Sequence, residues 1–151
     1  VAITLIGCFE MSNPDNPAPS LLRSLASLLG STAVGAGAFG AHALKETLAK
    51  RPNGPENWKT AVTYQLFHAA ALLALSALSA SSDVAAYKDK SADGMGNYAT
   101  AGKMMAAGTV MFSGSIYCLT LDVGPRKLLG PITPLGGLLM MSGWVAVGLA
   151  R

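Results

Sequence analysis

The sequence contains few charged residues, and this scarcity excludes an ordinary soluble domain. Asp, Glu, Lys and Arg together make up 13% of the chain, against roughly 25% in typical soluble domains. None of the four residue types occurs in residues 24–44, 60–82, 104–121 or 128–150. At about 1.5 Å per helical residue, each of these windows is long enough to cross the roughly 30 Å hydrocarbon core of a bilayer. We therefore expect an all-α integral membrane protein.

The windows also lack the alternation of a membrane β-strand. Such a strand alternates apolar and polar side chains over about ten residues, and no window does so. In hydrocarbon, backbone polar groups must be paired within the protein, which leaves helices as the spanning structure. Short connections with Pro, Asn and Gly favour antiparallel neighbours. The sequence predicts a bundle of four transmembrane helices in antiparallel up-down order.

We expect a single transmembrane domain behind an N-terminal extension. The extension would cover residues 1–22 and the domain residues 23–151. The expected spans are about 24–48, 58–80, 99–121 and 133–150, with a polar loop over 81–98. Thr133 has the chemistry of an N-cap, and Pro134 would lose no hydrogen bond in a first helical turn. These two residues place the start of the fourth span at 133.

Cysteines and catalytic groupings are equally scarce. Cys8 and Cys118 are far apart and offer neither zinc spacing nor a disulfide framework. Ser113 and Ser115, in the segment FSGSIY, have no acid, base or histidine in their span, and serines in membrane helices commonly bond backbone carbonyls or neighbouring helices. A net charge of +3 without an arginine cluster argues against a nucleic-acid partner. We predict no catalytic residue, no cofactor, no metal ion and no enzymatic activity.

Small residues are concentrated in the first expected span, around VGAGAFGAHALK at residues 34–45. Small residues spaced by four let helix backbones approach closely in lipid, where no hydrophobic effect drives helices together. The predicted helix-packing face consists of Ser31, Gly35, Ala36, Gly37 and Gly40. Two uses stay open for this face: packing inside the bundle, or docking another subunit.

Polar residues within the spans form a second pattern. The predicted polar seam consists of His42, Tyr64, Gln65, His68, Ser113 and Tyr117. Spacings of three and four residues place its members on shared helix faces, which should point into the bundle rather than into lipid. One interpretation is interhelical hydrogen bonding, worth about 0.6 kcal/mol per bond. The other is a small polar cavity for a proton, an ion or a quinone-like head group.

The two histidines also raise the question of a haem or metal site. Bis-histidine ligation needs His42 and His68 at similar depth on facing helices. If the first two spans turn near residue 53, His68 lies about one helical turn, roughly 6 Å, deeper than His42. No carboxylate within the spans could support such ligands. We therefore expect neither haem nor metal.

Four motifs carry a family resemblance: GAFGAHALK at 37–45, WKTAVTYQLFHA at 58–69, FSGSIY at 112–117 and GPITPLGGLLMMSGW at 130–144. In this order they resemble the YgdD-like family of uncharacterised four-span proteins of bacterial plasma membranes, which has mitochondrial relatives. The resemblance covers most of residues 24–150. It implies that His42, Gln65, His68, Ser113 and residues 133–137 are signature positions, and it implies no reaction.

Together these observations predict a non-enzymatic accessory subunit of a larger, respiratory-type organellar membrane complex. The expected partners are the lipid bilayer and other membrane-protein subunits. The expected location is the mitochondrial inner membrane, with a bacterial plasma membrane or another organellar membrane as the alternative. The alternative function is a small transporter or ion-conducting bundle that uses the polar seam.

Overall fold

The computed structural model describes residues 18–88 and 97–150, and helices joined by turns make up this part of the chain. The helices are α2 (Ala18–Ala41), α3 (Lys45–Ala49), α4 (Gly54–Lys88), α5 (Asn97–Leu121) and α6 (Arg126–Leu149). Four segments are long and apolar enough to cross a membrane: Ala18–Ala41, Gly54–Ala80, Tyr98–Leu121 and Arg126–Leu149. The predicted all-α bundle of four membrane-spanning helices is confirmed.

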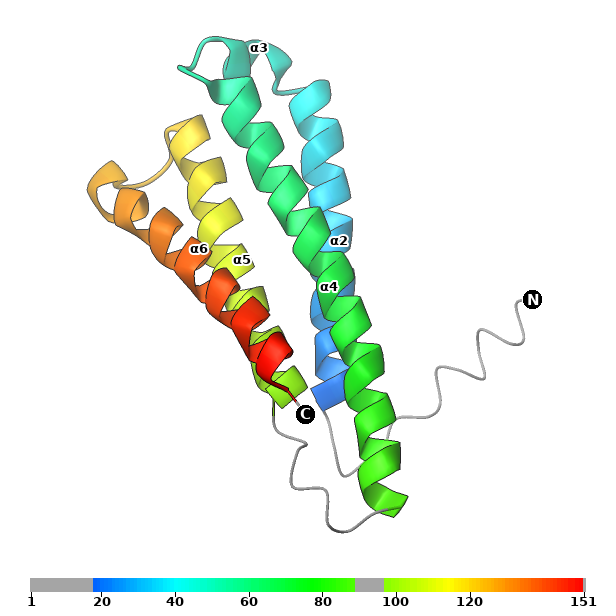
Figure 1. The fold of residues 1–151 in the computed structure, drawn as a ribbon. Coiled ribbons are helices and arrows are strands. Elements are labelled where there is room, and N and C mark those ends of the chain that lie inside the picture. Colours follow the sequence, from blue (N-terminus) through cyan, green and yellow to red (C-terminus); the bar gives the residue numbers. More distant parts are fainter. Residues whose placement is uncertain (1–17, 89–96, 151) are drawn as a thin grey trace, which may run out of the picture.

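The long helices pack in chain order. α2 lies against α4, α4 against α5, and α5 against α6. The connections through α3 and between α5 and α6 lie at the same end of the bundle, and the start of α2 and the end of α6 lie at the other (Figure 1). Within the described residues, the Cα traces of α4 and α6 come no closer than 8 Å. As a result α6 packs on α5 and leaves part of α4 uncovered.

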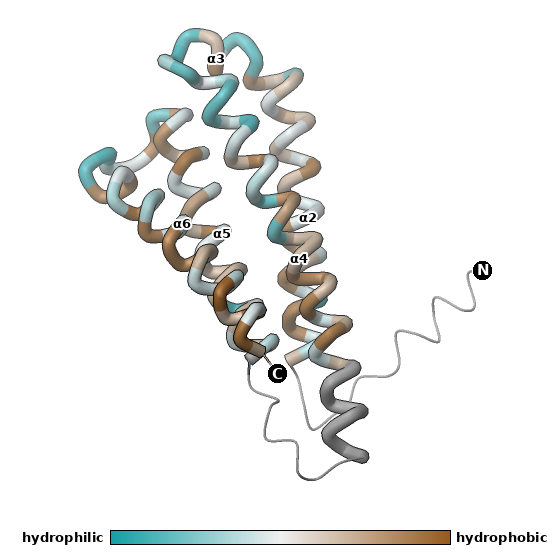
Figure 2. Tube along the Cα trace, in the orientation of Figure 1, coloured by the Kyte–Doolittle hydropathy of each residue, from teal (hydrophilic) through white to brown (hydrophobic). Residues whose placement is uncertain are grey.

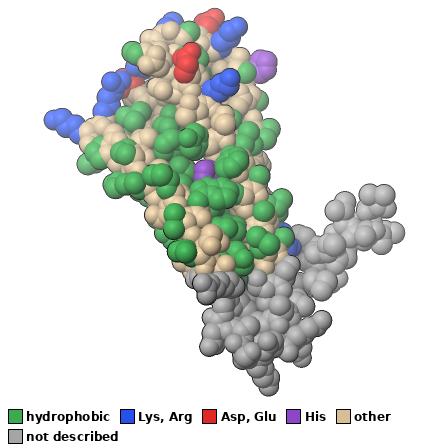
Figure 3. Space-filling view, viewed as in Figure 1, with side chains coloured by type: hydrophobic (Ala, Val, Ile, Leu, Met, Phe, Trp, Pro, Cys, Tyr) green, Lys and Arg blue, Asp and Glu red, His purple; other side chains and the backbone are tan. Residues whose placement is uncertain are grey.

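The outside of the bundle is apolar, as a membrane protein requires. Leu28, Phe39 and Leu149 are each about 60% exposed or more. Hydrophobic side chains spread over the flank in Figure 3, whereas most of the visible charges gather at the α3 end, and the hydropathy trace in Figure 2 shows the same division. An apolar surface of this extent would be a liability in water, but it is matched to lipid. The charge-poor spans are embedded in the bilayer.

Glycines bring the backbones of α5 and α6 together. A Cβ on Gly136 would lie 2.6 Å from the Phe112 nitrogen and 2.8 Å from the Gly108 oxygen, and one on Gly108 would lie 2.8 Å from the Gly136 oxygen. A Cβ on Gly143 would lie 2.6 Å from Met105 Cγ. Close backbone contact of this kind holds helices together in lipid through van der Waals packing.

The first span is shorter than expected at its C-terminal end. α2 stops at Ala41 instead of continuing to 48, and a turn over 42–44 leads into the short α3. The turn lets α3 bury Leu48, which is only 3% exposed, while Lys45 and Glu46 stay exposed. The short α3 thus covers the polar end of the bundle with a buried leucine beneath charged side chains.

The fourth span starts earlier than expected, at Arg126 rather than 133. Thr133 is not an N-cap, because it lies inside α6, where its hydroxyl is 3.3 Å from the Leu129 carbonyl and 2.7 Å from the Ser115 hydroxyl. Pro131 and Pro134 are accommodated inside the helix, as membrane helices often allow.

The boundaries of the second span differ as well. α4 begins at Gly54 instead of 58 and runs to Lys88, eight positions past the expected end at 80, into the predicted polar loop. α2 begins at Ala18 rather than near 24, so residues 18–22 of the expected extension belong to the first span. The rest of the extension, residues 1–17, and the middle of the expected loop, residues 89–96, lie outside the described residues.

Candidate functional site

Gln65 lies at the centre of the three-helix contact between α2, α4 and α5. Its side-chain nitrogen donates to the Leu29 carbonyl at 2.9 Å and to the Thr32 hydroxyl at 2.8 Å, both on α2. Its side-chain oxygen accepts the Tyr117 hydroxyl of α5 at 2.9 Å. Gln65 itself is only 6% exposed. Both amide hydrogens and the carbonyl oxygen are thus used within the protein.

The neighbouring hydroxyls also have partners. Thr32, which accepts from Gln65, donates to the Leu28 carbonyl at 2.7 Å. Ser113 of α5 donates to the Ala61 carbonyl of α4 at 2.9 Å and is 1% exposed. Gln65, Thr32 and Ser113 therefore all have partners within the protein, which is how helices are joined in a medium without water.

Trp58 closes this side of the bundle at the α3 end. Its indole nitrogen donates to the Ala36 carbonyl of α2 at 2.9 Å, and its ring centroid lies 4.6 Å from that of Tyr117. A Cβ on Gly40 would overlap the indole, and one on Gly37 would lie 3.4 Å from Val62. The glycines of α2 make room for α4 here.

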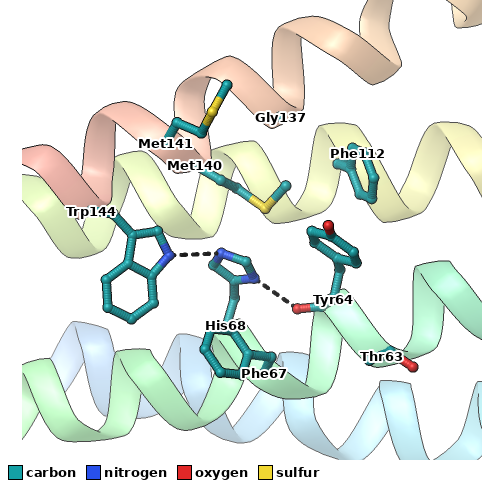
Figure 4. A pocket seen from close by; sticks show the side chains of 9 residues that line it. All are labelled: Thr63, Tyr64, Phe67, His68, Phe112, Gly137, Met140, Met141 and Trp144. Atoms are coloured by element: carbon teal, nitrogen blue, oxygen red, sulfur yellow. Dashed lines mark hydrogen bonds between the residues drawn. The ribbon is translucent and has the colours of Figure 1, made fainter.

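His68 lies one helical turn from Gln65 on α4, and it meets α6 instead of α2. Its Nδ1 is 2.8 Å from the Tyr64 carbonyl, and its Nε2 is 3.3 Å from Nε1 of Trp144. Because a carbonyl only accepts and an indole nitrogen only donates, the hydrogen of the imidazole is on Nδ1 and Nε2 is the acceptor. Figure 4 shows the Trp144 and His68 side chains pointing toward each other across the space between the two helices. His68 therefore presents its Nε2 acceptor toward α6.

A groove of about 460 Å³ surrounds this pair. Its lining comes from α4, α5 and α6: Thr63, Tyr64, Phe67, His68, Phe112, Gly137, Met140, Met141 and Trp144 (Figure 4). The rim is exposed, with Trp144 at 44% and Phe67 at 59%, whereas His68 is 3% exposed. The groove is thus an aromatic- and methionine-lined hollow on the flank, with one buried polar side chain at its base.

The predicted polar seam is divided by the structure. Gln65 and Tyr117 meet on the α2 side, where Ser113 also bonds α4. Tyr64 and His68 face the groove on the α6 side. His42 lies apart from both groups, exposed in the turn after α2, because the helix ends before it.

The predicted packing face is divided as well. Ala36, Gly37 and Gly40 contact the Trp58–Val62 region of α4. Ser31 and Gly35 point outward, and a Cβ on Gly35 would find nothing within 4 Å. Part of the predicted face therefore packs inside the bundle, and the other part is exposed on the outside of α2.

Three contact residues were not recognised in the sequence as members of the site: Thr32, Trp58 and Trp144. Trp144 stands in the GPITPLGGLLMMSGW motif, which was the available signal. Among the described residues, no group of three His, Cys, Asp or Glu side chains could hold a metal ion. The absence of a cofactor stays a prediction.

An ion-pair cluster joins the two connections at the α3 end. Asp122 lies 2.7 Å from Nε of Arg126 and 3.0 Å from an Arg51 nitrogen. The hydrogen bond from Arg126, followed by that from Arg51, lowers the pKa of Asp122 below its ordinary value. Asp122 has φ 62°, a conformation that Asp and Asn tolerate better than most residues.

Comparison with known families matches residues 36–137 to the family described as "Protein of unknown function (DUF423)". This match covers more than half of the chain, and its residues include Gln65, His68 and Ser113. The chain belongs to the DUF423 family. Its relatives are named UPF0382 membrane proteins, which agrees with the four membrane-spanning helices.

Relatives occur in bacteria and in a fungus. YwdK of Bacillus subtilis is 38% identical over 118 residues, which cover 78% of this chain and 85% of YwdK. A UPF0382 membrane protein of Staphylococcus aureus is 36% identical over 126 residues, covering 83% and 90%. One of Schizosaccharomyces pombe is 34% identical over 127 residues, covering 82% and 95%. No solved structure matches the chain. The resemblance to a small membrane-protein family is thus confirmed under the DUF423/UPF0382 name, and the YgdD-like name stays an expectation.

Proposed function

We propose that this DUF423 protein is a non-enzymatic accessory subunit of a larger membrane complex, and that the outward face of α2 docks a neighbouring subunit. The observation that carries this proposal is the division of the small-residue face. Ala36, Gly37 and Gly40 are used against α4, whereas Ser31 and Gly35 stay open on the surface. A second helix could approach there as closely as α4 approaches the inner part of the face.

The saturated polar network supports a structural role. Gln65 and Ser113 are buried and bonded to helix partners, so an ion passing between α2, α4 and α5 would have to break these bonds. Among the described residues, the side chains also form no group of three His, Cys, Asp or Glu that could hold a metal ion.

We place the complex in the mitochondrial inner membrane and expect it to be respiratory. A family shared by bacteria and a fungus is compatible with this membrane, because mitochondria descend from bacteria. The bacterial plasma membrane is the alternative. Fractionation of cells that express the tagged full-length chain tests the location, and recovery in any other organelle contradicts it.

Native electrophoresis after mild detergent extraction tests the docking role. We expect the wild-type chain in an assembly much larger than its own 15.4 kDa and the variant Gly35→Leu as a released subunit. Gly148→Leu is the matched control, because a Cβ there also finds nothing within 4 Å but lies on α6. Migration of the wild type only as a free chain or a homo-oligomer contradicts the proposal.

A transporter or ion-conducting bundle is the second candidate, favoured by the polar groups of Gln65 and His68 within the spans. Flux through liposomes that contain the purified chain tests it. Transport by the wild type that is abolished in folded Gln65→Leu or His68→Leu would replace the accessory role, and absence of flux in all three would reject the transporter.

A further inference from the structure

We propose that the groove between α4 and α6 is a binding site for a lipid-soluble phenol, an apolar molecule whose aromatic ring carries a hydroxyl group. The hydroxyl would bind between His68 and Trp144. This inference goes beyond the docking role and does not rest on it, because the groove and the outward face of α2 share no residue.

The His68–Trp144 pair is complementary to a hydroxyl group. Nε2 of His68 accepts and Nε1 of Trp144 donates, and their 3.3 Å separation exceeds the usual 2.7–3.2 Å for such bonds. A hydroxyl can donate to His68 and accept from Trp144 at the same time, whereas a carbonyl or ether oxygen satisfies only Trp144. Trp144 is 44% exposed and meets α4 only through its side chain, against Phe67 and His68, while the Cα traces of the two helices stay more than 8 Å apart. The indole can therefore move outward to admit the hydroxyl.

The position of the groove selects a ligand dissolved in hydrocarbon. His68 lies near the middle of the Gly54–Ala80 span and Trp144 lies within the Arg126–Leu149 span, so the opening faces the interior of the bilayer. Ions and water-soluble metabolites do not reach this depth at low energetic cost. A volume of about 460 Å³ is within the range of small-molecule sites.

The lining selects an aromatic ring. Tyr64, Phe67, Phe112 and Trp144 contribute aromatic surfaces, and the ring centroids of Tyr64 and Phe112 are 4.8 Å apart. Aromatic rings pack against one another in offset or edge-to-face geometry with a gain beyond area burial. Met140 and Met141 add flexible, polarisable contacts. A hydroxylated ring with an alkyl chain fits both the walls and the polar base.

A matched pair of ligands tests the proposal on the intact chain in phosphatidylcholine nanodiscs. The probes are 3-bromo-4-octylphenol and its methyl ether, whose bromine quenches tryptophan fluorescence at short range. Since the chain has two tryptophans, Trp58→Phe leaves Trp144 as the reporter, and Trp144→Phe leaves Trp58 to measure nonspecific partitioning. We expect saturable quenching of Trp144 by the phenol and about tenfold weaker binding of the ether, as expected for loss of a hydrogen bond.

Substitutions locate the site, still in the Trp58→Phe background. His68→Phe should make the phenol and the ether bind equally. Gly137→Leu should abolish binding of both by filling the groove, whereas Gly148→Leu, on the same helix but outside the groove, should leave it unchanged. Equal binding of the two probes to the Trp58→Phe chain, whose groove is unchanged, would overturn the proposal. Nonsaturable quenching of Trp144 in that chain, matching that of Trp58 in Trp144→Phe, would overturn it as well.

Discussion

The two sides of α4 use their polar residues in opposite ways. Toward α2 and α5, Gln65 is buried and every hydrogen-bonding atom of its side chain is paired within the bundle. Toward α6, His68 is equally buried, but its Nε2 has one long bond to a half-exposed tryptophan and borders a groove. The first side is built to hold helices together, and the second retains a polar group that a ligand can reach. On one helix, Gln65 thus serves the stability of the bundle, and His68 serves the proposed binding site.

Substitution of Gly136 should cause the largest loss of stability. Gly136 lets α6 lie close against α5, and this packing positions the α6 wall of the groove. We expect Gly136→Ala to cost about 1–3 kcal/mol, since the new Cβ meets backbone atoms of Phe112 and Gly108 that cannot move aside. SDS-induced unfolding in bicelles measures the loss. The neighbouring Gly137→Ala is the control, because its Cβ would make ordinary contacts at 3.8 Å or more; equal losses in both variants would contradict the assignment.

Gln65 offers the next largest effect. Gln65→Leu removes its bonds to Leu29, Thr32 and Tyr117, and at about 0.6 kcal/mol each the loss should approach 2 kcal/mol. Tyr117→Phe removes only one of these bonds and should cost about a third as much. The same unfolding assay checks the ratio. If the two variants lose the same stability, the network is not centred on Gln65.

Trp144→Phe should cost less than about 0.6 kcal/mol, because the bond it removes is long and its ring already faces lipid. The comparison between the two sides requires this loss to be clearly smaller than that of Gln65→Leu. A loss of equal size would show that the α6 side is also structural. Unfolding of both variants under identical detergent conditions decides between the two.

Asp122 should give the smallest effect, visible only in acid. Its folded-state pKa is lowered by the hydrogen bonds from Arg126 and Arg51, whereas the unfolded value is about 3.9. The stabilisation is therefore present above about pH 4 and is lost as the pH falls through the lowered folded-state value. The cluster is exposed, so screening keeps the effect small.

Stability profiles between pH 6 and 2 test this expectation. Asp122→Asn should flatten the acid limb while leaving the backbone undisturbed, because Asn also tolerates φ 62°. An unchanged profile would mean that the two arginines do not stabilise the folded state through Asp122. Within the described residues, the Asp122 cluster shares no contact with Gln65 or His68. The variant therefore serves as a control for the stability losses measured at those two residues.

Much of the architecture could be predicted because lipid imposes a simple rule on composition. Four charge-free windows were enough to identify four spans, since a charged side chain in hydrocarbon is costly and backbone groups must pair internally. The pairing of Gln65 with Tyr117 was within reach for the same reason. The start of α6 was not, because Thr133 and Pro134 have the chemistry of a helix start although the helix already runs through them.

Position along a helix did not reveal which neighbour each polar residue would meet. Gln65 and His68 are three residues apart and were placed on one seam. In the structure Gln65 bonds the closely packed α2, whereas His68 bonds the more distant α6. His42 was separated from both by the turn that buries Leu48.

The sequence by itself determined that this is a four-span, all-helical membrane protein with the motifs of a small membrane-protein family, because charge distribution and local motifs carry that information. Only the tertiary structure decided that the backbone of α6 packs on α5 and stays away from that of α4, that Ser31 and Gly35 face outward, and that the Trp144 side chain meets His68 over a groove. These features depend on how closely glycines let two helices approach each other. The distance of approach is set by both helices together, so the sequence of one helix does not determine it.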